Sequence, residues 1–198
     1  MKSHHFLTIY KEKKEVLRAR TILGTIIGVL VAFLVIEAVA VFSGDTTLII
    51  IILIGGFSMS VPAILLLRGF LRLSSIFLYL NVVIIMTVSS IFGQGIHDIA
   101  MITYPVAIFF ASLVLQRRDF FWLSLLAIGA IGYLGFGEAF GWYVSKAHND
   151  LVGVDFIIAI VILIFTIYIA DALAENVRRN MQIAEKEIAL RKKAQKQL

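Results

Sequence analysis

The sequence contains no cysteine among its 198 residues. Disulfide bonds and thiolate metal sites are therefore excluded, and the redox compartment stays open. Charged residues are also scarce, at 16%, whereas 60% of the residues are hydrophobic and the mean hydropathy is +0.95. Because a soluble domain has about 45–50% apolar residues, this composition indicates a membrane protein.

Two further features are missing. The basic amino-terminal twenty residues are not followed by the short apolar run and small-residue cleavage site of a removable signal peptide. The regular alternation of a transmembrane β-barrel is also missing, since long unbroken runs such as LIIIILIG occur instead. Both observations favour an all-α membrane protein whose first apolar segment stays in the mature chain.

Six apolar segments have about the 20-residue length that a membrane-spanning helix needs. They predict a six-helix bundle at residues 21–171, between a basic amino-terminal arm (1–20) and a carboxy-terminal helix (172–198). The predicted spans are 21–43, 47–67, 73–92, 99–116, 120–143 and 154–171.

The basic residues predict the orientation. Seventeen of the 18 Lys and Arg residues lie in the two terminal segments or in the connections at 68–72 and 117–118, and only Lys146 lies on the other side. By the positive-inside rule both termini are cytoplasmic, in a multi-pass protein of the cell membrane. The same residues explain the basic isoelectric point as contacts with anionic lipid, so nucleic acid is not expected as a partner.

The last segment has no glycine or proline after Gly153, so we expect the sixth helix to continue into the cytoplasm from Asp171. Alternating steps of three and four residues form a short apolar seam, typical of a parallel dimeric coiled coil. The alternative is a solvated tail helix. The chain ends at Leu198 without a helix terminator, and we expect an output domain to follow. The seam comprises Ala174, Val177, Met181, Ala184 and Ile188.

Three stretches resemble one known group of proteins: GQGIHDIAMITYP, LVLQRRDFFWLSLLAI and the tail EKEIALRKKAQKQL. With them the whole chain resembles the amino-terminal six-helix membrane module of prokaryotic sensor histidine kinases and related diguanylate cyclases. The resemblance implies a receptor domain, with a homodimeric kinase-type output beyond it. No catalytic motif is present in these residues, and a cofactor is not indicated.

Ionisable side chains are costly inside a membrane and often mark function. Several polar side chains are predicted at the outer ends of the spans, where they could line an outward-facing pocket for a small ligand or ion. Interhelical hydrogen bonds are the alternative interpretation. The candidate ligand-binding residues are Glu37, Gln94, His97, Asp98, Tyr104 and Glu138.

Other residues are expected to shape the helices. Asn81 should hydrogen-bond between helices, and Pro105 should kink the fourth span beneath the GQGIHD loop. Gly137 and Gly141 form a GxxxG pair for close helix packing, with a softened helix as the alternative. In the loop itself, Gly93 and Gly95 can adopt positive φ.

Three other functions remain as alternatives. His97, Asp98, His148 and Asp150 carry metal-ligand side chains, although their spacing matches no recognised motif. A transporter would show broken helices in repeated halves, and an intramembrane metal-dependent hydrolase would need its catalytic groups within reach of one another. The sequence favours a transmembrane sensory domain that transmits through its last helix.

Overall fold

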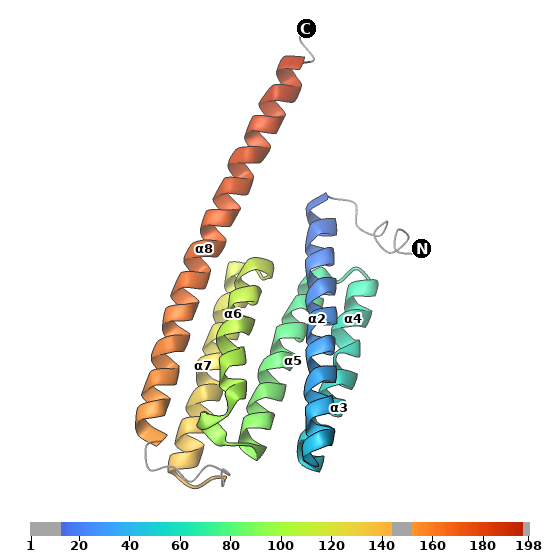
Figure 1. Ribbon diagram of the computed structural model, residues 1–198. Coiled ribbons are helices and arrows are strands. Elements are labelled where there is room, and N and C mark those ends of the chain that lie inside the picture. The colour runs from blue at the N-terminus through green and yellow to red at the C-terminus, as the bar shows by residue number, and fades with distance from the viewer. Residues whose placement is uncertain (1–12, 144–151, 196–198) are drawn as a thin grey trace.

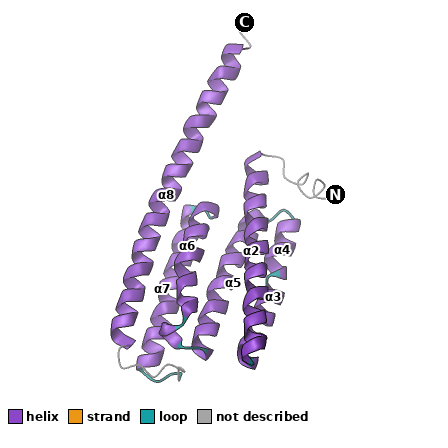
Figure 2. Cartoon of the chain, in the orientation of Figure 1, coloured by secondary structure: helices purple, strands orange, loops and turns teal. Residues whose placement is uncertain are grey.

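A computed structural model of the chain describes residues 13–143 and 152–195 (Figure 1). Every element in this part of the chain is helical, and helices joined by short loops are seen throughout (Figure 2). The expected all-α class is therefore confirmed for these residues. The elements are α2 (Lys13–Ser43), α3 (Thr46–Ser58), α4 (Ser60–Leu67), α5 (Leu71–Phe92), the 3-10 helices η1 (Gly95–His97) and η2 (Ile99–Ile102), α6 (Thr103–Val114), α7 (Arg117–Ala139) and α8 (Val152–Gln195).

Five helical segments are long and apolar enough to cross a membrane, which fits a multi-pass membrane protein. They are Arg18–Ser43, Thr46–Leu67, Leu71–Phe92, Arg117–Ala139 and Phe156–Val177. The remaining predicted span, at 99–116, contains the shorter helix α6 of 12 residues. At 1.5 Å per residue α6 is about 18 Å long, against a hydrocarbon core of about 30 Å. The sixth crossing stays a prediction.

Only Met59 separates α3 from α4 within the predicted span 47–67, and it keeps helical backbone angles (φ −64°, ψ −14°) while its N–H donates to the Gly55 carbonyl at 3.2 Å. Pro62 follows one turn after Ser58 and has no N–H to donate to the Ser58 carbonyl, four residues earlier. Pro105, which was expected to kink the fourth span, lies instead in the first turn of α6. A proline in the first turn removes few intrahelical hydrogen bonds, and the kink expected at Pro105 stays a prediction.

Helix α5 forms the centre of the bundle. It packs against α2, α3, α4, α6 and α7, and Figure 1 shows it between α2 on one side and α7 on the other. In α5 and α7, 44% of the most apolar window is buried, compared with 17% in α2 and 11% in α8. The flanking helices therefore leave much of their surface for lipid or for a partner.

The two ends of the bundle carry different connections. We call the end with η1 and the turn at Gly44 the loop end, and the end with the turns at Gly69 and Gln116 the basic end (Figure 1). Successive helices run between these two ends. Arg72, Arg117 and Arg118 lie at the basic end, on the first turns of α5 and α7.

Helix α8 is continuous over 44 residues, which corresponds to about 66 Å. It packs against α6, α7 and η1 and then runs far past the other helices (Figure 1). The side chains that face the bundle recur at steps of three and four residues. They are Phe156, Ile160, Leu163, Ile167, Ala170 and Ala174.

The predicted coiled-coil seam continues this stripe without a change of phase. The sequence had placed Ala174 in the seam that contacts a partner helix. In the structure Ala174 is 3% exposed because it packs within its own chain, so it is not available to a partner helix. Val177 and Ala184 are exposed. The side chains of Met181 and Ile188 lie outside the described part of the structure. The uncovered seam therefore begins at Val177.

Candidate functional site

The GQGIHD loop is closed by its own aspartate. An Asp98 carboxylate oxygen accepts a hydrogen bond from the Gln94 backbone N–H at 3.2 Å, and the same carboxylate lies so close to Gly93 that any side chain there would collide with it. Gly95 has φ +61°, which glycine adopts cheaply. Gly93 has φ −94°, so the expected positive φ holds for Gly95 only, and Gly93 is needed for space.

The loop reaches the helix that leaves the bundle. Element η1, which ends at His97, contacts α5, α7 and α8. His97 and Asp98 are half-buried, as is Glu138 near the last residue of α7. These three predicted site residues therefore lie at the same end of the bundle, close to where α7 ends and α8 begins.

Tyr104 is buried between helices. Its hydroxyl lies 2.6 Å from Oγ1 of Thr87 on α5, and the Thr87 hydroxyl donates to the Val83 carbonyl at 2.7 Å. The tyrosine must then be the donor in its own bond, because a hydroxyl has one hydrogen. Tyr104 thus ties α6 to α5.

Glu37 lies apart from the other predicted site residues. It is half-buried on α2, and one carboxylate oxygen is buried with no hydrogen-bond partner among the described residues. Helix α2 packs against α3, α4, α5 and α6, and Figure 1 shows α2 and α7 on opposite sides of α5. The structure does not group Glu37 with Glu138, although both lie near the loop end.

The predicted GxxxG pair has a different role. Helix α7 ends at Ala139, and Gly141 follows it with φ +68°. The N–H of Gly141 donates to the Glu138 carbonyl at 3.2 Å, and the N–H of Trp142 donates to the Gly137 carbonyl at 2.8 Å. These two bonds form a Schellman cap. The expectation of helix packing through Gly137 and Gly141 is therefore corrected, because Gly141 terminates the helix.

Tyr143 completes this end of α7. Its hydroxyl donates to the Leu134 carbonyl at 2.6 Å, and its ring fills the space beside Gly137. Burial, together with the negative charge of Glu138, raises the pKa of Tyr143 to about 12. The hydroxyl therefore stays protonated and donates at any physiological pH.

The contact between α7 and α8 at the loop end uses a glycine that the sequence analysis had not singled out. The ring of Phe156 on α8 packs directly on Gly135, leaving no space for a side chain at that position. The rings of Phe136 and Phe156 lie 5.2 Å apart. Because the segment contains several glycines, the sequence alone does not indicate which of them contacts another helix.

Asn81 lies beside the break in the second span. Its Nδ2 donates to Oγ of Ser58 at 2.6 Å, and that hydroxyl donates to the Gly55 carbonyl at 2.7 Å. This interhelical contact joins α5 to the end of α3. It lies one turn before Pro62, which cannot donate a backbone hydrogen bond.

Two ion pairs tie helices together at the basic end. Arg72 on α5 donates two hydrogen bonds of 2.8 Å to the carboxylate of Asp119 on α7. Arg117 on α7 lies 3.2 Å from the carboxylate of Asp171 on α8. Asp171, from which the last helix was expected to continue past the bundle, thus has an ion-pair partner on α7.

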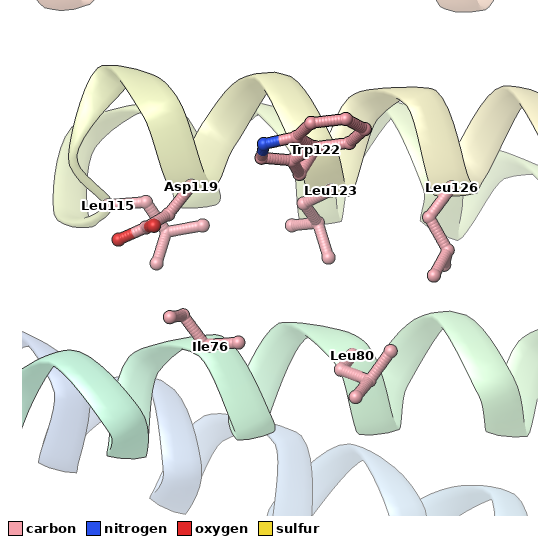
Figure 3. Close-up of a pocket in the computed structure, with 7 residues that line it drawn as sticks. All are labelled: Ile76, Leu80, Leu115, Asp119, Trp122, Leu123 and Leu126. Atoms are coloured by element: carbon pink, nitrogen blue, oxygen red, sulfur yellow. The ribbon is translucent and has the colours of Figure 1, made fainter.

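Two cavities also lie toward the basic end. One, of about 200 Å³, lies between α5 and α7, where Ile76 and Leu80 face Trp122, Leu123 and Leu126, with Asp119 and Leu115 at one end (Figure 3). The other, of about 410 Å³, lies between the first turns of α7 and residues 164–172 of α8. Neither cavity is lined by a residue of the predicted outward-facing pocket.

In the described part of the chain, His, Asp and Glu side chains form no group of three or more that could hold a metal ion. The structure therefore adds no ligand to His97 and Asp98 for the metal-site interpretation. His148 and Asp150 lie outside the described residues.

Comparison of the chain with protein-family models, with curated proteins and with solved structures finds no match. The functional argument therefore depends on the geometry of the chain itself.

Proposed function

We propose that this chain is a transmembrane sensory module, in which a small ligand or ion at the loop end shifts α8 relative to α7. The continuity of α8 carries this proposal. One unbroken helix contacts the loop end at its start and extends far beyond the basic end (Figure 1). With no flexible joint between these points, displacement of the first half must move the second half.

The input site of the proposal is formed by His97, Asp98 and Glu138, with Gln94 at the turn of the loop. What supports this position is the contact of η1 with both α7 and α8. A ligand that changes the packing of η1 therefore acts on both helices. Only the difference in affinity between two arrangements of α8 shifts their equilibrium.

The output of the proposal is a homodimer of the type found in sensor histidine kinases and diguanylate cyclases, with six membrane crossings and both termini in the cytoplasm. The seam at Val177 and Ala184 supports it, because these two residues are one heptad apart and both are exposed. In a parallel dimer the two copies of each residue would face each other.

Cysteine cross-linking tests the proposal, because the chain has no cysteine of its own. Val177→Cys and Ala184→Cys should form intermolecular disulfides quickly under mild oxidation in membranes. Arg179→Cys is the matched control, since Arg179 is exposed on the same helix but lies off the seam. Equal rates at all three positions would contradict the dimer.

The same assay tests the coupling between the loop end and α8. In the Val177→Cys protein, His97→Ala or Asp98→Asn should change the cross-linking rate at least about twofold, which corresponds to roughly 0.4 kcal/mol between two arrangements. Leu53→Ala, an exposed position on α3, serves as the control. A rate unchanged by both loop variants would remove the input site from the proposal.

One observation favours a second candidate, transport. The second apolar segment is interrupted at Met59 with the Asn81–Ser58 hydrogen bond beside it, and transporter binding sites form at interruptions within a span. Proteoliposomes loaded with a pH-sensitive dye would detect proton movement after an imposed gradient. Flux abolished by Asn81→Leu would favour transport over sensing.

A further inference from the structure

The 410 Å³ cavity between α7 and α8 is a groove that opens to the outside of the bundle. Its rim is exposed: Phe121 is 62% exposed and Tyr168 is 72% exposed. Its floor is buried, and is formed by Phe120 and Ser124, each 4% exposed. The volume falls in the range of sites that hold small ligands, roughly 300–1,000 Å³. We call it the α7–α8 groove.

Ser124 gives the groove an unused hydrogen-bonding group. Its hydroxyl is buried and has no partner within the described part of the chain. Other hydroxyls in these helices bond to carbonyls of their own helix, as Ser112 does to Phe109 at 2.7 Å and Thr166 does to Ile162 at 2.8 Å. A buried polar group without a partner is costly. An acceptor on a molecule in the groove would satisfy it.

The mouth of the groove is charged. Arg117 and Asp171 pair there at 3.2 Å, and their side chains are 73% and 36% exposed. Exposed ion pairs contribute little to stability, so a phosphate can replace the Asp171 carboxylate as the partner of Arg117. The Arg117 guanidinium can bind a phosphate with two parallel hydrogen bonds. The described residues at this end include Arg68, Arg72, Arg117 and Arg118 beside Asp119 and Asp171, so basic side chains outnumber acidic ones there.

These groups are arranged along one axis. Ser124 is seven residues from Arg117, or about 10 Å deeper along α7, with apolar walls around it from Phe120 and Ile164. A matching molecule has an anionic head, a hydrogen-bond acceptor below it and an apolar body. Glycerophospholipids with a net negative charge have this order of groups and reach the groove directly from the bilayer.

We propose that the α7–α8 groove binds one anionic glycerophospholipid, with its phosphate on Arg117, an ester carbonyl on the Ser124 hydroxyl and an acyl chain against Phe120 and Ile164. Binding transfers Arg117 from Asp171 to the lipid and so releases the attachment of α8 to α7 at the basic end. This site is independent of the proposed input site at the loop end.

Native mass spectrometry of the whole chain, released from nanodiscs of equal parts phosphatidylglycerol and phosphatidylcholine, tests the proposal. One phosphatidylglycerol should be retained in preference to phosphatidylcholine. Arg117→Gln should weaken its retention about tenfold or more, since it removes charge-assisted hydrogen bonds. Arg118→Gln, with the same charge change on the adjacent residue, should change it less than about twofold.

Lipid chemistry tests the Ser124 contact without altering the protein. Phosphatidylglycerol with ether in place of ester linkages lacks the carbonyls and should bind about three- to tenfold more weakly. Ser124→Ala should weaken the ester lipid equally and remove the ester–ether difference, whereas Ser112→Ala should preserve it. Inorganic phosphate alone should not displace the lipid, which separates a lipid site from a site for free phosphate.

Three results would overturn the proposal. Equal retention of both headgroups would remove the charge recognition, and equal weakening by Arg117→Gln and Arg118→Gln would indicate general surface attraction. Equal binding of ester and ether lipids to the unaltered chain would remove the role of Ser124. Because the last comparison needs no substitution, it decides the point even where a variant fails to fold.

Discussion

The two ends of the interface between α7 and α8 are built differently. At the loop end, Phe156 packs on Gly135 with no space between the helices. At the basic end, a 410 Å³ groove separates the same helices, and the exposed Arg117–Asp171 pair bridges them. Close packing determines one position, whereas an exposed ion pair tolerates several. The start of α8 is therefore held more closely to α7 than the part where α8 leaves the bundle.

The largest expected effect comes from disturbing the packing of α8 on α7 at the loop end. Gly135→Val places side-chain atoms against the Phe156 ring, and overpacking of this kind costs about 1–3 kcal/mol. The free energy of unfolding in mixed detergent micelles measures it. Gly132→Val is the control, because an added Cβ there meets no atom within 4 Å and the change in helix propensity is the same. Equal losses in the two variants would show that the Phe156 contact is not tight.

A middle-sized effect compares one hydroxyl at each end. Tyr143→Phe removes the hydrogen bond to the Leu134 carbonyl at the loop end and should lower the free energy of unfolding by about 1 kcal/mol. Ser124→Ala at the groove removes a hydroxyl with no partner in the described structure and should cost nothing in detergent without added lipid. Thermal unfolding of both proteins checks this. A loss in Ser124→Ala as large as in Tyr143→Phe would mean that the hydroxyl is bonded.

The smallest effect is expected from the bridging ion pair. Asp171→Asn should lower the free energy of unfolding by less than about 1 kcal/mol, and added salt should shrink the difference from the unaltered chain, because exposed charges are screened. Asp119→Asn should cost more and respond less to salt, since the Asp119 side chain is 9% exposed and accepts two bonds from Arg72. Unfolding at low and high salt distinguishes the two.

The helical class and the length of α8 followed from local patterns. The predicted span 73–92 agrees with α5 (Leu71–Phe92) to within two residues at its start, and the lack of glycine or proline after Gly153 predicted one long helix. Both depend on neighbouring residues in the chain. Helix propensity and apolar run length describe such short-range order directly.

The arrangement of side chains around the bundle axis was not predictable in this way. Counting residues from a span's end places Glu37 and Glu138 at similar depths, but it does not show which helices are neighbours, and α5 lies between α2 and α7. The sign of φ at Gly141 is equally invisible in a GxxxG spacing. The Arg72–Asp119 pair joins residues 47 positions apart, so it depends on tertiary packing.

The geometry of α8 makes it a lever. If the contact of Phe156 with Gly135 is the pivot, Asp171 lies about 22 Å from it and Gln195 about 58 Å, at 1.5 Å per residue. A displacement of about 1 Å at the ion pair then becomes about 2.6 Å at the far end of the helix. Small changes at the ion pair, of the size of a side-chain rearrangement, are thereby enlarged at the far end of α8 without any bending of the helix.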